Sequence, residues 1–158
     1  MTVVLPAARA DASTPPMPSP LAWCEAPLDV RINQLRQGVP SSWLRQSEET
    51  TGLSRSALCS LLGLKVSTIN RKLHNATPLS PDESERFMGL HRLIGQVEAV
   101  VRDCGDGQPF DAAAWLGSWL QRPNAALGGA LPASYMDTAE GREQLGRLIS
   151  AQRSGAYV

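Results

Sequence analysis

The chain of 158 residues has few of the groups on which enzymes commonly depend. It contains two histidines, His74 and His91, which are widely separated in the sequence. No glycine-rich phosphate loop follows a predicted strand, because no segment alternates apolar and polar residues as strands do. The acids Asp82, Glu83 and Glu85 are explained by their place at the start of a predicted helix. We therefore expect no catalytic activity and no cofactor.

Cysteine and long apolar runs are also scarce. The three cysteines, Cys24, Cys59 and Cys104, are odd in number and too far apart to suggest a disulfide framework or a zinc site. No stretch approaches the roughly 20 apolar residues of a membrane span, and the apolar run at residues 1–5 is shorter than a signal-peptide core. These absences predict reduced thiols, a cytoplasmic location, no metal and no membrane partner.

The chain also lacks an excess of either charge. Its 15 basic and 15 acidic residues give a formal net charge of zero, which at first argues against nucleic acid as a partner. Between residues 52 and 80, however, Arg55, Lys65, Arg71 and Lys72 occur without a single acid. This basic window indicates where a phosphate backbone could bind.

Proline dominates the first 27 residues, whereas the rest of the chain has the periodicity of helices. Because proline removes backbone donors and no period is visible there, residues 1–27 are predicted to be a disordered tail. From Leu28 onward, apolar residues recur at spacings of three and four. The sequence thus predicts an all-helical protein: a helix-turn-helix domain over residues 28–78, joined by a long helix to a small helical domain within residues 79–158.

Capping residues predict where the helices begin. Three side chains that can accept from free helix amides precede helical runs: Ser41, Ser54 and Asp111. The clearest start is the capping box of Ser80 with Glu83, followed by an apolar stripe of about 22 residues. Asp137 with Glu140 predicts a second capping box, for a last helix that ends near Gly155.

Residues 54–73 have the pattern of two short helices joined by a tight turn. Cys59 is the small residue expected where the helices cross, Gly63 turns the chain and Ile69 anchors the second helix. The opposite face offers hydroxyl, amide and guanidinium groups to phosphates and base edges, although a merely solvated face is the alternative. The candidate DNA-binding residues are Arg55, Lys65, Ser67, Thr68, Asn70, Arg71, Lys72 and His74.

Four further segments resemble one family. They are VSTINRKL (66–73), LSPDESERFMGLHRLI (79–94), AWLGSWLQRPNAALGGALPASYMDTAEGREQLGRLI (114–149) and GAYV (155–158). In this order they resemble the antitoxins of the Xre/MbcA/ParS type, whose toxins carry the RES domain. The resemblance implies a toxin-binding domain over residues 79–158, an NAD-degrading toxin, and a C-terminal end that obstructs the toxin's active site.

On this resemblance, the candidate toxin-binding residues are Trp119, Asn124, Leu127, Arg153, Gly155, Ala156, Tyr157 and Val158. Several of them have a plainer alternative. Trp115 and Trp119, one turn apart, more usually pack in a core, and the loop at 123–129 can simply shape a turn. Tyr157 and Val158 could form a frayed end. His91, near the edge of an apolar stripe, is expected to be structural.

The sequence therefore predicts a type II antitoxin. It would bind and neutralise a RES-domain toxin, and repress its own operon by binding operator DNA. A homodimer is expected, because one short recognition helix covers too little DNA for specificity. The alternative is a solitary helix-turn-helix regulator whose C-terminal half serves dimerisation or an effector. A RES-domain reading frame beside this gene would favour the antitoxin.

Overall fold

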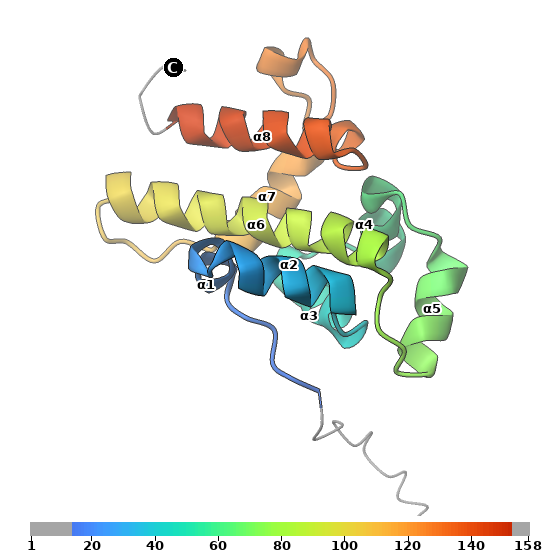
Figure 1. Ribbon diagram of the computed structural model, residues 1–158. Helices are drawn as coiled ribbons and strands as arrows, with labels where there is room; N and C mark the ends of the chain where they lie inside the picture. The colour runs from blue at the N-terminus through green and yellow to red at the C-terminus, as the bar shows by residue number, and fades with distance from the viewer. Residues whose placement is uncertain (1–13, 153–158) are drawn as a thin grey trace, which may run out of the picture.

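The computed structural model describes residues 14–152, and within that range all regular structure is helical, as predicted (Figure 1). The elements in chain order are α1 (Pro20–Glu25), α2 (Leu28–Gln37), α3 (Ser42–Thr51), α4 (Arg55–Leu62), α5 (Val66–His74), α6 (Pro81–Cys104), α7 (Ala112–Leu120), the 3-10 helices η1 (Ala125–Leu127) and η2 (Pro132–Tyr135), and α8 (Ala139–Ala151). None of these helices has the length and apolarity needed to cross a bilayer.

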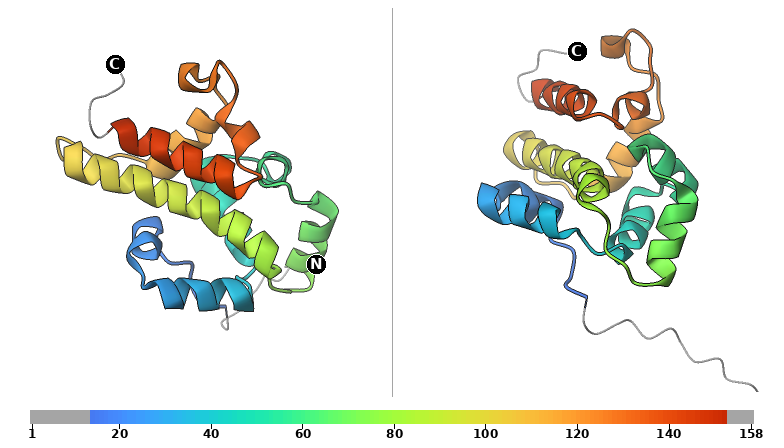
Figure 2. Two further views of the ribbon diagram at one scale, coloured as in Figure 1. Left: turned by 45° about the horizontal axis from the view of Figure 1, so that its top comes forward. Right: turned by 45° about the vertical axis from the view of Figure 1, so that its right-hand side comes forward.

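The long helix α6 is the axis around which the other elements pack. In both views of Figure 2, α8 runs along one side of α6, while α1 and α2 lie along the other. Behind α6, α7 packs against both α6 and α3. Phe87, Leu90 and Ile94 of α6 are buried in one cluster with Leu116 of α7 and Leu145 of α8. A single continuous core therefore joins the two halves of the sequence.

Local capping explains where most helices begin. The predicted box at α6 is present: Ser80 Oγ accepts from Glu83 N at 3.1 Å, and Glu83 Oε2 accepts from Ser80 N at 2.7 Å. Ser54 caps α4 by accepting from the amide of residue 57 at 3.1 Å, and Asp111 caps α7 by accepting from that of residue 114 at 2.9 Å. These three predicted starts are confirmed.

Two other predicted caps are wrong. Ser41 has helical backbone angles, and its hydroxyl donates to Lys72 O at 3.3 Å instead of capping α3. At α8 the cap is Thr138, whose extended backbone lets its hydroxyl accept from Gly141 N at 3.0 Å. Asp137 lies one residue too early for that contact. The last helix ends at Ala151, before the predicted stop.

The expectation of a disordered tail does not hold for residues 20–25, which form α1. Ser19 caps this helix, Pro20 occupies its first position, where proline is favoured, and Trp23 is only 6% exposed against the core. Gly95 of α6 permits the close approach, since a Cβ there would lie 2.4 Å from Pro20 O. Residues 1–13 lie outside the described part of the chain.

Candidate functional site

The helices α4 and α5 form the tight helical corner that the sequence predicts. Gly63, at φ 66°, ends α4 in the left-handed conformation, and the next amide, Leu64 N, donates to Cys59 O at 2.8 Å. Cys59 and Ile69 are both fully buried where the two helices meet. The helix-turn-helix geometry is thus confirmed, with α5 in the position of the recognition helix.

The outer side of α5 carries most of the candidate DNA-binding residues. This helix lies at the edge of the molecule (Figure 1), and its half-buried Thr68 sits on the flank. The exposed candidates on α5 or just before it are Lys65, Ser67, Asn70, Arg71 and His74. Within residues 14–152, neither Lys65 nor Arg71 takes part in an ion pair, so both cations are available to a phosphate backbone.

Arg55, by contrast, is engaged within the protein. Its Nε and Nη2 donate to the Glu48 carboxylate at 2.6 and 3.1 Å, and its Nη1 donates to Asn70 Oδ1 at 3.1 Å. The hydrogen bonds that Arg55 donates to Glu48 raise the pKa of Arg55. The guanidinium therefore braces α3 and α4 against α5, and Asn70 is partly occupied by the same contact.

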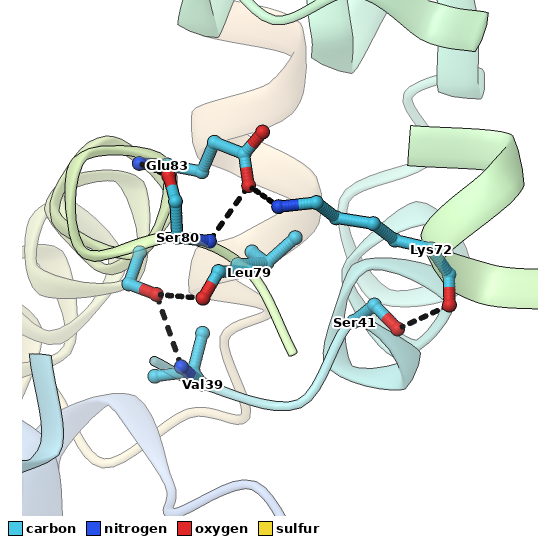
Figure 3. Close-up of polar contacts among 7 residues, drawn as sticks. Val39, Ser41, Lys72, Leu79, Ser80 and Glu83 are labelled. Atoms are coloured by element: carbon cyan, nitrogen blue, oxygen red, sulfur yellow. Dashed lines mark hydrogen bonds and ion pairs between the residues drawn. The ribbon is translucent and has the colours of Figure 1, made fainter. Parts of the chain in front are cut away.

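Lys72 is also held inside the protein, at the junction of α5 with α6 (Figure 3). Its Nζ lies against Glu83 Oε2, the oxygen that also accepts from Ser80 N. Burial alone would raise the pKa of Glu83, but the hydrogen bonds from Lys72 and Ser80 outweigh it and lower that pKa. The carbonyl of Lys72 accepts from Ser41. Lys72 is therefore a junction residue, which its place in the basic window did not reveal.

The tryptophans of α7 lie mostly in the core. The rings of Trp115 and Trp119 are stacked, with centroids 5.8 Å apart and planes 15° apart. Trp119 is only 7% exposed, which leaves little of this toxin-binding candidate for a partner. Phe110 extends the row, 6.3 Å from Trp115, and is 47% exposed. The accessible end of the aromatic row is therefore Phe110, which sequence reasoning did not single out.

The loop after α7 is a compact turn held by Asn124. Its side chain accepts from Ala126 N at 2.9 Å, and its backbone N–H donates to Ala130 O at 3.0 Å. Gly128 and Gly129 have positive φ angles of 64° and 86°, which glycine adopts without strain. Asn124 is thus committed to the loop itself. Leu127, half-buried, packs against the core.

The remaining toxin-binding candidates, Arg153, Gly155, Ala156, Tyr157 and Val158, lie outside the described residues. His91 has the structural role expected of it: it is 2% exposed, with Nε2 2.8 Å from Pro18 O. Burial lowers its pKa, so the folded protein holds it neutral.

Comparison with known proteins assigns a family to both halves of the chain. Residues 30–87 match the antitoxin Xre-like helix-turn-helix domain, and residues 96–155 match the antitoxin Xre/MbcA/ParS C-terminal toxin-binding domain. The Prs ADP-ribosylating antitoxin of Sphingobium sp. (strain YBL2) is 38% identical over 145 residues, which cover 92% of this chain and 91% of that relative. Both matched regions include part of α6.

Proposed function

Because the chain belongs to the family of Xre-like antitoxins with an Xre/MbcA/ParS toxin-binding domain, we propose that its partner is a RES-domain toxin that consumes NAD. The observation that carries this proposal is the name of the relative, which couples an antitoxin with ADP-ribosylation. ADP-ribose is ordinarily transferred from NAD, so an NAD-consuming toxin suits that name. The antitoxin itself is not an enzyme.

Neutralisation is proposed to depend on residues 153–158, which follow α8. This helix is anchored by Leu145 and Ile149, both buried, so the segment after it starts from a fixed point. Tyr157 supplies a rigid aromatic side chain with a polar tip, a type that often dominates an interface. Deleting residues 155–158 should leave folding unchanged but impair growth rescue in cells that express the toxin. Equal rescue by the truncated and full-length proteins would instead place inhibition on the folded surface.

Repression of its own operon forms the second part of the proposal. The exposed face of α5, with Lys65, Ser67, Arg71 and His74, would bind operator DNA in a homodimer that presents two such helices. NAD and the operon are both cytoplasmic, so the protein would act there. The match to a toxin-binding domain favours an antitoxin over a solitary transcriptional regulator.

Co-expression with a neighbouring RES-domain reading frame, followed by pull-down on a tagged antitoxin, tests the partner. A stable complex in which the toxin no longer consumes NAD is expected. The toxin freed from the complex and the toxin still bound to the antitoxin should be assayed in parallel for consumption of NAD. A RES-domain protein that neither co-purifies nor loses activity would contradict the proposal.

A further inference from the structure

A groove of about 690 Å³ crosses the face of α6 between α2 and α8. In Figure 1 the three helices lie side by side, with α6 between α2 and α8. The floor of the groove is apolar: Trp23, Met88 and Leu93 are buried there, and Ile32 and Leu35 of α2 are half-buried. Such a floor can take the apolar side chains of a bound segment.

The walls of the groove are rich in arginine. Four guanidiniums and two carboxylates line it, from all three helices: Arg31, Arg92, Arg142 and Arg147, with Glu85 and Glu143. Glu143 is already paired with Arg147 at 2.7 Å. Within residues 14–152, Arg92 is exposed and has no ion-pair partner. Cations therefore exceed anions around an apolar floor.

One of these arginines is fixed in place by the packing of α8 on α6. Arg142 lies across Gly89, where a Cβ would come within 2.6 Å of its Cδ. Its Nη1 donates to Met136 O at 2.8 Å. A half-buried guanidinium held in this way loses little further freedom when it binds a carboxylate.

A neighbouring polar atom also lacks a partner. Gln96 lines the same groove, and its Oε1 is buried without a hydrogen bond to any described residue. Buried acceptors are nearly always satisfied in stable structures, but this atom is already enclosed by the protein, so it offers no contact for a bound segment. The groove thus offers an apolar floor and an excess of cations, of which Arg142 is held in place.

We propose that this groove docks an acidic amphipathic segment of the toxin, with apolar side chains on the floor and carboxylates against the arginines. The proposal rests on the proposed toxin partnership. Guanidinium groups bind carboxylates through two parallel hydrogen bonds, and a groove between helices is a common seat for an amphipathic helix. The toxin is chosen over a second copy because α8, which carries Arg142 and Arg147, lies in the matched toxin-binding region.

The groove also spans both matched regions. Arg31, Ile32 and Leu35 belong to the helix-turn-helix match, whereas α8 belongs to the toxin-binding match. The helix α2 has no buried residue, and its Leu28 is 63% exposed. A segment in the groove would cover α2 and link it to α8, so toxin binding would stabilise part of the helix-turn-helix match.

Charge reversal of two exposed lining residues tests the proposal. The double variant Arg92→Glu/Arg147→Glu is compared with Arg36→Glu/Arg45→Glu, whose arginines are also exposed but do not line the groove. Binding to the inactivated RES-domain toxin of the neighbouring reading frame is measured by calorimetry at low and at physiological salt. The groove variant should raise the Kd for the toxin by about tenfold or more, with the larger change at low salt. The control variant should raise that Kd by less than about twofold.

Different failures have different meanings. If the wild type binds the toxin and the groove variant binds equally well, the groove proposal is overturned while the proposed function stands. If the wild type does not bind the toxin, the proposed function itself fails. A groove variant that turns a toxin-free dimer into a monomer would assign the groove to a second copy and overturn the toxin assignment.

Two further measurements guard the interpretation. Circular dichroism must show that the groove variant is folded; if it is not, Arg92→Gln/Arg147→Gln replaces it, with the same expected loss of affinity. Hydrogen exchange of the wild type should show new protection in α2 and α8 when the toxin binds. Protection confined to residues 110–135 would overturn the proposal, because those residues lie outside the groove.

Discussion

The ammonium group of Lys72 contacts the carboxylate of Glu83, the same carboxylate that closes the capping box of α6 with Ser80 (Figure 3). One acidic side chain therefore both starts the long helix and holds the end of the recognition helix. The orientation of α5 is tied to α6 through this contact. It is the one ion pair between α5 and α6 among the described residues.

Glu83→Gln should lower the free energy of unfolding by about 1–2 kcal/mol at neutral pH, because the charged hydrogen bond to Lys72 is lost. The pKa of Glu83 is lowered in the folded protein, so its stabilisation is present above the ordinary value of 4.5 and disappears as the pH falls through the lower folded value. Urea unfolding of both proteins at neutral and strongly acidic pH measures this. The control Glu85→Gln, exposed on the same helix, should change stability by less than about 0.5 kcal/mol.

Acidification should destabilise the protein through His91. Burial lowers its pKa below the ordinary value of 6.5, so the unfolded chain takes up a proton that the folded protein resists. Stability is then full above 6.5 and falls as the pH drops toward the folded value. Thermal melts across this range should show a shallower pH dependence for His91→Gln than for the wild type. The matched control is His74→Gln, a change at an exposed site that should leave the stability at neutral pH close to that of the wild type.

Gly95→Val should displace α1 from α6. A Cβ at this position would lie 2.4 Å from Pro20 O and 2.6 Å from Cys24 Sγ, and the branched side chain adds further bulk. Overpacking of this kind costs about 1–3 kcal/mol. Limited proteolysis should cut the variant near residues 14–26 faster than the wild type. A comparable change at the exposed Ala114, Ala114→Val, should leave that segment as resistant as before.

Arg71→Ala should weaken operator binding by about 1–3 kcal/mol if this exposed guanidinium contacts a guanine. The wild-type affinity should fall steeply with salt, as expected for phosphate contacts. Electrophoretic shift assays on the promoter of the operon measure both effects. Arg45→Ala, on α3 and also exposed, serves as the control. If the folded Arg71 variant binds the operator as tightly as the wild type, Arg71 does not contact the operator bases.

The sequence predicted most features that depend on contacts a few residues apart, although the caps expected at Ser41 and Asp137 were wrong. The caps at Ser80, Ser54 and Asp111 each join positions three apart in the chain, so the pattern alone sufficed to find them. The turn at Gly63 likewise needs only a residue that tolerates positive φ. All-helical architecture and the helix-turn-helix corner followed from the same local rules.

Features made by distant residues could not be read in this way. The pairing of Lys72 with Glu83 depends on how α5 and α6 meet. For this reason the sequence alone suggested that Lys72 was free to bind DNA, whereas it is paired within the protein. The proline-rich segment around α1 shows no apolar periodicity. Its Trp23 is nevertheless buried, because α1 packs against α6, which lies far along the chain. Trp119 could be assigned to the core or to a partner only once its burial was known.

The continuity of α6 has a consequence for how the protein unfolds. Phe87 lies in one matched region and Val97 in the other, and both are buried along the same uninterrupted helix. Neither half keeps its core if α6 unravels, because one helix supplies a wall to each. The two matched regions should therefore lose their cores together, in one cooperative unfolding transition.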